Sequence, residues 1–107
     1  MRLTDDGSTV TLDLHGARID AALRAARRAA SLCAARGRHR LVLVHGASTT
    51  TPTQTRPTIK RALHAWLDAG LPPGVAHADR DDTRLALTFA LGAPRDPQRL
   101  GLRDVAT

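Results

Sequence analysis

A chain of 107 residues is long enough for one hydrophobic core and too short for two domains. Its formal charge of +6, carried almost entirely by arginine, favours a polyanionic partner such as nucleic acid, although a codon bias toward G and C would enrich arginine as well. No apolar stretch approaches the roughly 20 residues that a transmembrane helix needs, and the N-terminus lacks the apolar segment of a signal peptide, so we expect a soluble, cytoplasmic protein with no membrane partner.

The first predicted element is a β-strand over residues 9–15. Apolar residues occupy every second position, and the polar face of the strand ends in Asp13 and His15. An amphipathic helix follows over residues 18–36, because apolar residues recur there at steps of three and four. The single cysteine, Cys33, lies on the apolar side of this helix, so we interpret it as a buried hydrophobic residue rather than a nucleophile.

A continuous apolar run at residues 41–44 indicates a second strand, central in the sheet and covered on both sides. Residues 47–57 contain six hydroxyl-bearing residues and two prolines, and we expect them to form a loop. A second amphipathic helix is predicted to run to about Ala69, with Thr55 or the residue after it as the N-terminal cap.

The last part of the chain predicts a β-hairpin, with strands at residues 75–78 and 83–91 and a turn at residues 79–82. Residues 93–107 carry two prolines and scattered charge, so we assign them to a C-terminal tail that docks or frays. The order β-α-β-α-β-β predicts an α/β fold, an α+β two-layer sandwich with a mixed four-stranded sheet, in a single domain over residues 1–92.

Two of the predicted strands end in the same dipeptide, at His15-Gly16 and at His45-Gly46. Strands joined by a helix run parallel, so both ends lie at one edge of the sheet, where open α/β sheets bind ligands. If the strands are adjacent, Asp13, His15 and His45 converge there. This set suits phosphodiester cleavage, with one histidine as general base, the other as general acid, Asp13 fixing a tautomer and arginines holding the phosphate.

The same residues have other interpretations. Asp13 can cap the loop that follows its strand, and a histidine at a strand end is often structural. A metal site would place a divalent cation, Mg²⁺ or Mn²⁺, on Asp13 and the histidines, yet magnesium prefers several oxygen ligands and the first two strands supply one carboxylate. Asp79, Asp81 and Asp82 reach the same edge if the third strand is also parallel, so chemistry with and without a metal both stay open.

Three segments carry a resemblance to a known family: LDLHG at residues 12–16, VHG at 44–46 and IKRALHAWL at 59–67. Over about residues 8–92 the chain resembles the Smr domain, the small MutS-related domain. The resemblance implies a fold similar to the C-terminal domain of a bacterial translation initiation factor. It also implies endonuclease activity, since members of the family nick DNA or cut mRNA on stalled or collided ribosomes.

The resemblance places the Asp-Leu-His motif of the family on Asp13 and His15, and its second motif on His45 and Gly46. It implies that Asp13, His15 and His45 are the catalytic residues and that their neighbours contact phosphates. The expected nucleic-acid-binding residues are Gly16, Gly46, Ser48, Thr49, Arg56, Lys60 and Arg61. The expected partner is RNA or structured DNA, with the ribosome as a further candidate.

The chain departs from the family after Gly46. Family members continue as a glycine-rich turn, HG-x-G-x-G, whereas this chain continues as ASTTTP. Glycines let backbone amides approach a phosphate, and the hydroxyls of Ser48, Thr49 and Thr50 can replace those amides as donors. Two alternatives to a nuclease follow: a module that binds nucleic acid or ribosomes without cleaving, and a domain whose strand-end histidines are structural.

Overall fold

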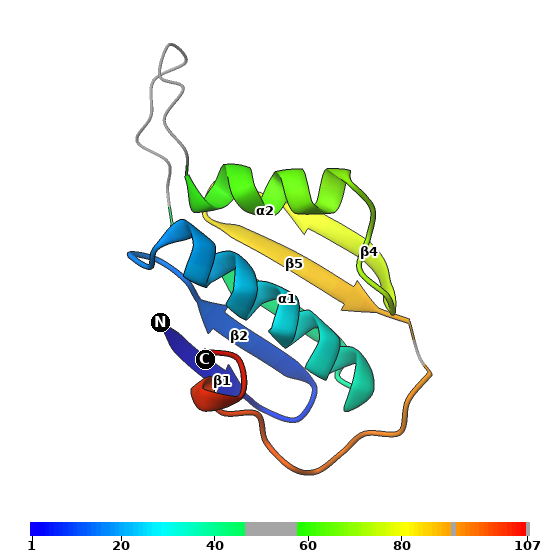
Figure 1. The fold of residues 1–107 in the computed structure, drawn as a ribbon. Helices are drawn as coiled ribbons and strands as arrows, with labels where there is room; N and C mark the ends of the chain where they lie inside the picture. The colour runs from blue at the N-terminus through cyan, green and yellow to red at the C-terminus, as the bar shows by residue number, and fades with distance from the viewer. Residues whose placement is uncertain (47–57, 91, 107) are drawn as a thin grey trace.

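The computed structural model describes residues 1–46, 58–90 and 92–106. Within them the chain forms a mixed sheet of five strands with two α-helices (Figure 1). The elements in chain order are β1 (Arg2–Asp5), β2 (Thr9–Asp13), α1 (Ile19–Ala35), β3 (Arg40–Val44), α2 (Ile59–Asp68), β4 (Val75–Arg80), β5 (Arg84–Phe89) and the short 3₁₀ helix η1 (Leu102–Asp104). The predicted α+β fold is confirmed, with one strand more than expected.

The strands lie in the order β1-β2-β3-β5-β4. β2 and β3 are parallel, and the other three pairings are antiparallel. Because β5 runs opposite to both of its neighbours, β4 runs in the same direction as β2 and β3. The carboxyl ends of these three strands therefore meet at one edge of the sheet, which carries both His-Gly steps and the turn after β4.

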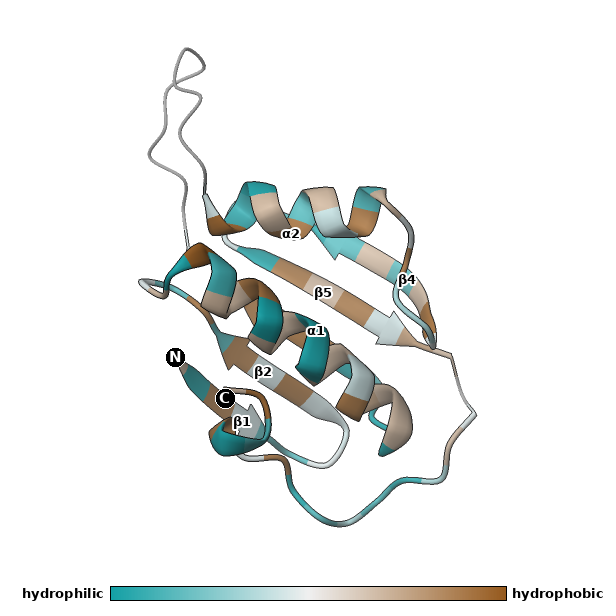
Figure 2. Ribbon diagram, viewed as in Figure 1, coloured by the Kyte–Doolittle hydropathy of each residue, from teal (hydrophilic) through white to brown (hydrophobic). Residues whose placement is uncertain are grey.

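The helices begin and end where local chemistry favours it. α1 is followed by Gly37, whose φ of +68° lies in the left-handed region that glycine adopts after a helix. α2 is capped by Thr58, whose Oγ1 accepts a hydrogen bond from the backbone N–H of Arg61 at 3.1 Å. The expected cap, Thr55, lies outside the described residues. Figure 2 shows hydrophilic residues on the side of α1 turned away from the sheet.

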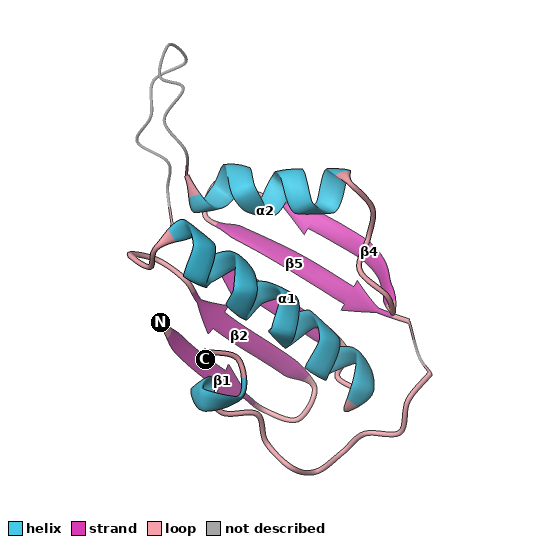
Figure 3. Ribbon diagram, viewed as in Figure 1, coloured by secondary structure: helices cyan, strands magenta, loops and turns pink. Residues whose placement is uncertain are grey.

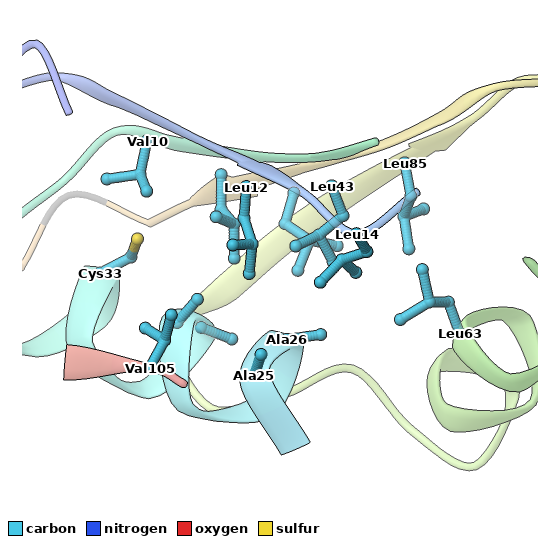
Figure 4. Close-up of a cluster of buried hydrophobic side chains, with 14 of the residues drawn as sticks. Val10, Leu12, Leu14, Ala25, Ala26, Cys33, Leu43, Leu63, Leu85 and Val105 are labelled. Carbon is cyan, nitrogen blue, oxygen red and sulfur yellow. The ribbon is translucent and has the colours of Figure 1, made fainter. Parts of the chain in front are cut away.

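Both helices cover the same face of the sheet (Figure 3). The side chains of β2, β3 and β5 that point toward them are fully buried, and α1 packs on them through small residues (Figure 4). The small residues of α1 in the core are Ala22, Ala25, Ala26, Ala29, Ala30 and Cys33. Burial raises the pKa of the Cys33 thiol to about 12, which agrees with its interpretation as a hydrophobic residue.

The opposite face of the sheet is not covered by either helix, so the expectation that the strand at residues 41–44 is covered on both sides is wrong. Val42 and Val44 point to this open face and are only half-buried. In the part of the chain that the structure describes, neither helix has the length and apolar character needed to cross a bilayer.

β1 is a short edge strand that the sequence analysis missed. It pairs antiparallel with β2, so that Leu3 lies opposite Leu12. Its last residue, Asp5, forms a fully buried ion pair with Arg38, in which Oδ2 and Nη2 are 3.0 Å apart. Arg38 follows α1, so this pair ties the edge of the sheet to the helix layer.

The C-terminal segment docks onto β1 and α1. Leu100 and Val105 are buried in the core. The backbone N–H of Leu100 donates a 2.8 Å hydrogen bond to Asp5, and Arg38 donates to the carbonyl oxygens of Asp96 and Gln98. A single buried ion pair thus holds both ends of the chain against the domain.

Candidate functional site

Asp13 is the last residue of β2, and His15 lies in the turn that follows. Oδ1 of Asp13 accepts a hydrogen bond from the backbone N–H of His15 at 3.0 Å. The N–H of Leu14 donates to the carbonyl oxygen of Val44 at 2.8 Å, so pairing with β3 continues past the end of β2. The imidazole of His15 is exposed and the carboxylate of Asp13 is half-buried. Asp13 therefore orients His15 through its backbone and places a negative charge beside it.

His15 and Gly46 are in contact across the ends of β2 and β3. Gly46 has a φ of +82°, and a Cβ built on it would lie 2.6 Å from Cδ2 of His15. Real Cβ atoms essentially never lie so close to another atom, so a side chain at position 46 would force the exposed imidazole of His15 to shift, and the positive φ independently favours glycine. Gly16 has a similar φ of +80° with nothing within 4 Å of its Cβ position. The glycine of the second His-Gly step thus makes room for the histidine of the first.

His45 points to the helix side of the sheet and is only 6% exposed. Its Nδ1 lies 2.8 Å from the carbonyl oxygen of Gly46. Because a carbonyl oxygen only accepts, Nδ1 carries the hydrogen and Nε2 of the neutral ring keeps its lone pair. This Nε2 is buried and has no hydrogen-bond partner among the described residues. Buried polar atoms without a partner are rare in native proteins.

His64 of α2 faces His45, and the sequence analysis did not assign it to the site. The two ring centroids are 6.3 Å apart, with the rings at 83° to each other. Its Nε2 is likewise buried, with no partner in the part of the chain described. Burial lowers the pKa of His64, and the positive charges of Arg80 and Lys60 lower it further. The sequence offered one indication of its place: His64 lies four residues after Lys60, so both are on one face of α2.

The turn after β4 supports the end of β3. The carbonyl oxygen of Thr83 accepts hydrogen bonds from the backbone N–H groups of His45 and Gly46, at 3.0 and 3.1 Å. Oδ1 of Asp81 accepts from the N–H groups of Thr83 and Arg84, and these bonds lower the pKa of Asp81. Asp81 therefore stabilises the turn between β4 and β5, and this turn holds the backbone of His45 and Gly46.

The model of the Smr domain family matches residues 12–84, well over half of the 107 residues. The chain belongs to the Smr domain family. The matched region contains both His-Gly steps, α2 and the turn after β4, and it leaves out β1 and the C-terminal segment. No curated protein and no solved structure matches the chain. Smr domains are known for nuclease and nucleic-acid-binding activity, and membership in the family implies an interaction with nucleic acid.

Two of the three cationic residues expected to bind nucleic acid, Lys60 and Arg61, lie on the first turn of α2 in this Smr domain. Lys60 is half-buried, and its Nζ is 3.7 Å from the fully exposed carboxylate of Asp82. Arg61 is exposed on the neighbouring position. Ser48, Thr49 and Arg56 lie outside the described residues. Because the carboxylate of Asp82 is fully exposed and the pair is 3.7 Å long, the pair contributes little energy, and a phosphate can compete for the lysine.

The carboxylates at the end of β4 and in the turn after it do not join Asp13 in a cluster. Asp79 lies 3.0 Å from Nε2 of His77, with which it shares the open face of the sheet. Asp81 is bonded to its own turn, and Asp82 lies near Lys60. Across residues 1–46, 58–90 and 92–106, no three side chains of the types His, Cys, Asp or Glu are placed to hold a metal ion.

Proposed function

We propose that this Smr domain cleaves phosphodiester bonds of RNA or structured DNA at the edge formed by Asp13, His15 and His45. The contact between His15 and Gly46 carries the proposal, because it places an exposed imidazole against the end of β3. A solvent-facing imidazole at the carboxyl edge of the sheet, in a chain with a formal charge of +6, is suited to proton transfer on a bound phosphodiester.

In the proposed reaction His15 takes the proton from the attacking oxygen, which is a water or a ribose 2′-hydroxyl. The new bond forms between that oxygen and phosphorus, and the bond from phosphorus to the leaving oxygen breaks. The leaving oxygen takes a proton from solvent, and His15 later releases its own. Asp13 stabilises the protonated ring by its charge, and Lys60 and Arg61 offset the charge of the phosphate.

His45 is assigned a different role from the one that its sequence position suggested. With 6% of its surface exposed it has little access to a substrate, and its Nδ1 is held by the carbonyl oxygen of Gly46. We propose that His45 is a positioning residue, which fixes the Gly46 turn against which His15 packs. His64, 6.3 Å away between ring centroids, supports His45 from α2.

The second candidate is a module that binds nucleic acid or ribosomes without cutting. Two observations favour it: Asp13 is bonded to a backbone amide, and Asp82 places a carboxylate 3.7 Å from the amine of Lys60. In this case Asp13 and His15 shape the edge of the sheet without moving a proton.

The test uses purified full-length chain on labelled single-stranded RNA, supercoiled plasmid and a branched duplex, each with Mg²⁺, with Mn²⁺ and with chelator. The variants are Asp13→Ala and His15→Ala, with His39→Ala as the control, because His39 is exposed at the opposite edge of the sheet. Cleavage that is lost in the first two and kept in the control supports the nuclease. Cleavage that persists in both would contradict the site. Salt-sensitive binding without any cleavage supports the module.

A further inference from the structure

Two hollows flank the outward face of α1. The first, of about 280 Å³, lies between α1 and the end of α2 and is lined by Arg27, Ala30, Ser31, Ala34, Trp66, Pro72 and Pro73. The second, of about 410 Å³, lies between α1 and the C-terminal segment and is lined by Arg24, Arg27, Arg28, Ser31 and Val105. Arg27 and Ser31 line both, so the hollows adjoin across one ridge of the helix. We call them together the α1 groove.

The polar residues of the α1 groove follow the period of the helix. Arg24, Arg27, Arg28 and Ser31 recur at steps that place them on one face, and all four are exposed. Arg24 forms an exposed ion pair with Asp20, at 3.7 Å. Arg28 donates from Nε to the carbonyl oxygen of Asp104. Arg27, at the centre, has no ion pair or hydrogen bond to any described residue. No acidic residue lines either hollow, so the groove favours an anion.

The first hollow adds an aromatic surface to these cations. Trp66 is the only tryptophan in the chain, and it is half-buried beside Pro72 and Pro73. The volume of about 280 Å³ lies at the low end for small-molecule pockets, roughly 300–1,000 Å³, so the hollow suits one flat group rather than a whole cofactor. An aromatic ring beside a guanidinium is the combination that binds single-stranded nucleic acid, since the ring stacks on a base and the cation holds a phosphate.

We propose that the α1 groove binds a single-stranded segment of nucleic acid, with one base on Trp66 and the flanking phosphates on Arg27 and Arg24. The inference rests on the proposed function and names the surface along which the substrate runs. α1 begins at Ile19, directly after the turn that carries His15, and Arg27 lies eight residues further, about 12 Å along the helix axis. A duplex is a poor occupant, because its bases are already stacked on one another.

The experiment uses the intrinsic fluorescence of Trp66, which reports on this groove alone because the chain has no other tryptophan. The full-length chain is titrated with oligouridine, with oligothymidine of equal length and with a duplex of the same length. We expect the single strands to quench the fluorescence and the duplex to leave it nearly unchanged. The Trp66→Leu variant, measured by anisotropy of a labelled oligonucleotide, should bind about tenfold or more weakly, and Trp66→Phe should recover part of the loss.

Arg27→Gln and Arg40→Gln form the matched pair, since each removes one exposed arginine and Arg40 lies on the open face of the sheet. Arg27→Gln should weaken binding several-fold and reduce the slope of log K against log salt by about 0.7, the value for one phosphate contact on a single strand. Arg40→Gln should behave as wild type. Thermal denaturation shows whether each variant is folded, and Arg27 is exposed enough that its loss should not unfold the chain.

Three results would contradict the proposal that the α1 groove binds single strands. They are binding without quenching of Trp66, equal weakening of binding by Arg27→Gln and Arg40→Gln, and no binding to any of the probes. The outcome for cleavage is separate. If Arg27→Gln and Trp66→Phe cleave with wild-type KM, the proposal that the α1 groove binds the substrate is contradicted, and the proposal of nuclease activity is unaffected. If wild type does not cleave while the groove variants lose binding, the binding proposal is supported and the nuclease proposal is contradicted.

Discussion

The imidazole of His15 packs against the α-carbon of Gly46, so closely that a Cβ on Gly46 would come within 2.6 Å of its ring. This contact joins the ends of two parallel strands that are separated by the whole of α1. It gives the repeated His-Gly dipeptide a physical reason. His15 contacts a residue without a side chain, and that residue is Gly46 of the second His-Gly dipeptide.

Substituting Gly46 with alanine should affect both stability and cleavage. Gly16→Ala is the control for stability, because the two glycines have φ values of +82° and +80° and only Gly46 is crowded. Each alanine should cost about 1–2 kcal/mol for its left-handed backbone. Gly46→Ala should cost more, and it should reduce cleavage by moving His15. Equal losses of melting temperature in the two variants, with normal cleavage by Gly46→Ala, would contradict the contact.

Asp13→Asn separates the charge of Asp13 from its hydrogen bond. The amide oxygen of asparagine can accept the same bond from the N–H of His15, at 3.0 Å in the native chain, so the turn should keep its shape. We expect stability within about 0.5 kcal/mol of wild type and a strong loss of cleavage, because the variant removes the negative charge two residues before His15 in the chain. Asp13→Ala should lose about 1 kcal/mol as well. Wild-type cleavage by Asp13→Asn would show that Asp13 only shapes the turn.

The stability of the protein should fall as the pH drops below 6.5, in part through His64. Burial, followed by the charges of Arg80 and Lys60, holds the pKa of His64 below its usual 6.5. Above pH 6.5 the ring is neutral in both states and contributes no pH dependence. Below it the unfolded chain binds the proton first, so unfolding becomes easier. His64→Gln should flatten the melting temperature between about pH 6.5 and 5, whereas the exposed His39→Gln should not. Identical slopes in wild type and His64→Gln would refute this.

The ion pair of Asp5 with Arg38 should be the most sensitive point of the fold. Burial, the largest single effect, raises the pKa of Asp5, yet the hydrogen bonds from Arg38, Leu100 and Gly7 together bring it below 3.8. Its contribution to stability is therefore present above pH 3.8 and is lost as the pH falls below that value.

Asp5→Asn leaves the guanidinium of Arg38 buried without its counter-charge, which costs about 3–5 kcal/mol. Asp20→Asn is the control, since Asp20 is exposed and its ion pairs with Arg18 and Arg24 are 3.7 Å long. The control should lose at most about 1 kcal/mol. Urea denaturation at pH 7 measures both, and a loss of similar size in the two variants would contradict the role of the buried pair.

Much of this fold follows from local patterns in the sequence. The alternation in β2 and β5, the helical period of α1 and α2, and the apolar run of β3 each predicted an element close to its observed bounds. Parallel pairing of β2 with β3 followed from the helix that joins them. These features depend on residues close together in the chain, so local sequence patterns can predict them.

The missed features depend on contacts between distant residues. β1 has only four residues, and it becomes a strand because Leu3 pairs with Leu12 and Asp5 meets Arg38. The uncovered face of β3 depends on where α1 packs, which a run of apolar residues does not encode. In the candidate site, the shared edge followed from topology. The burial of His45 and its neighbour His64 required the packing of α2 on the sheet.

The most direct test of proton transfer by His15 is the single-turnover cleavage rate of His15→Gln compared with that of wild type. It is measured with saturating enzyme on the substrate that wild type cleaves best. Glutamine keeps a polar side chain of similar length at this exposed position and cannot exchange a proton near neutral pH. We predict a rate lower by about 10²–10⁴-fold, the usual contribution of one acid–base group, with unchanged affinity for the oligonucleotide. A rate within a factor of two or so of wild type would contradict the assignment of His15 as the residue that moves the proton.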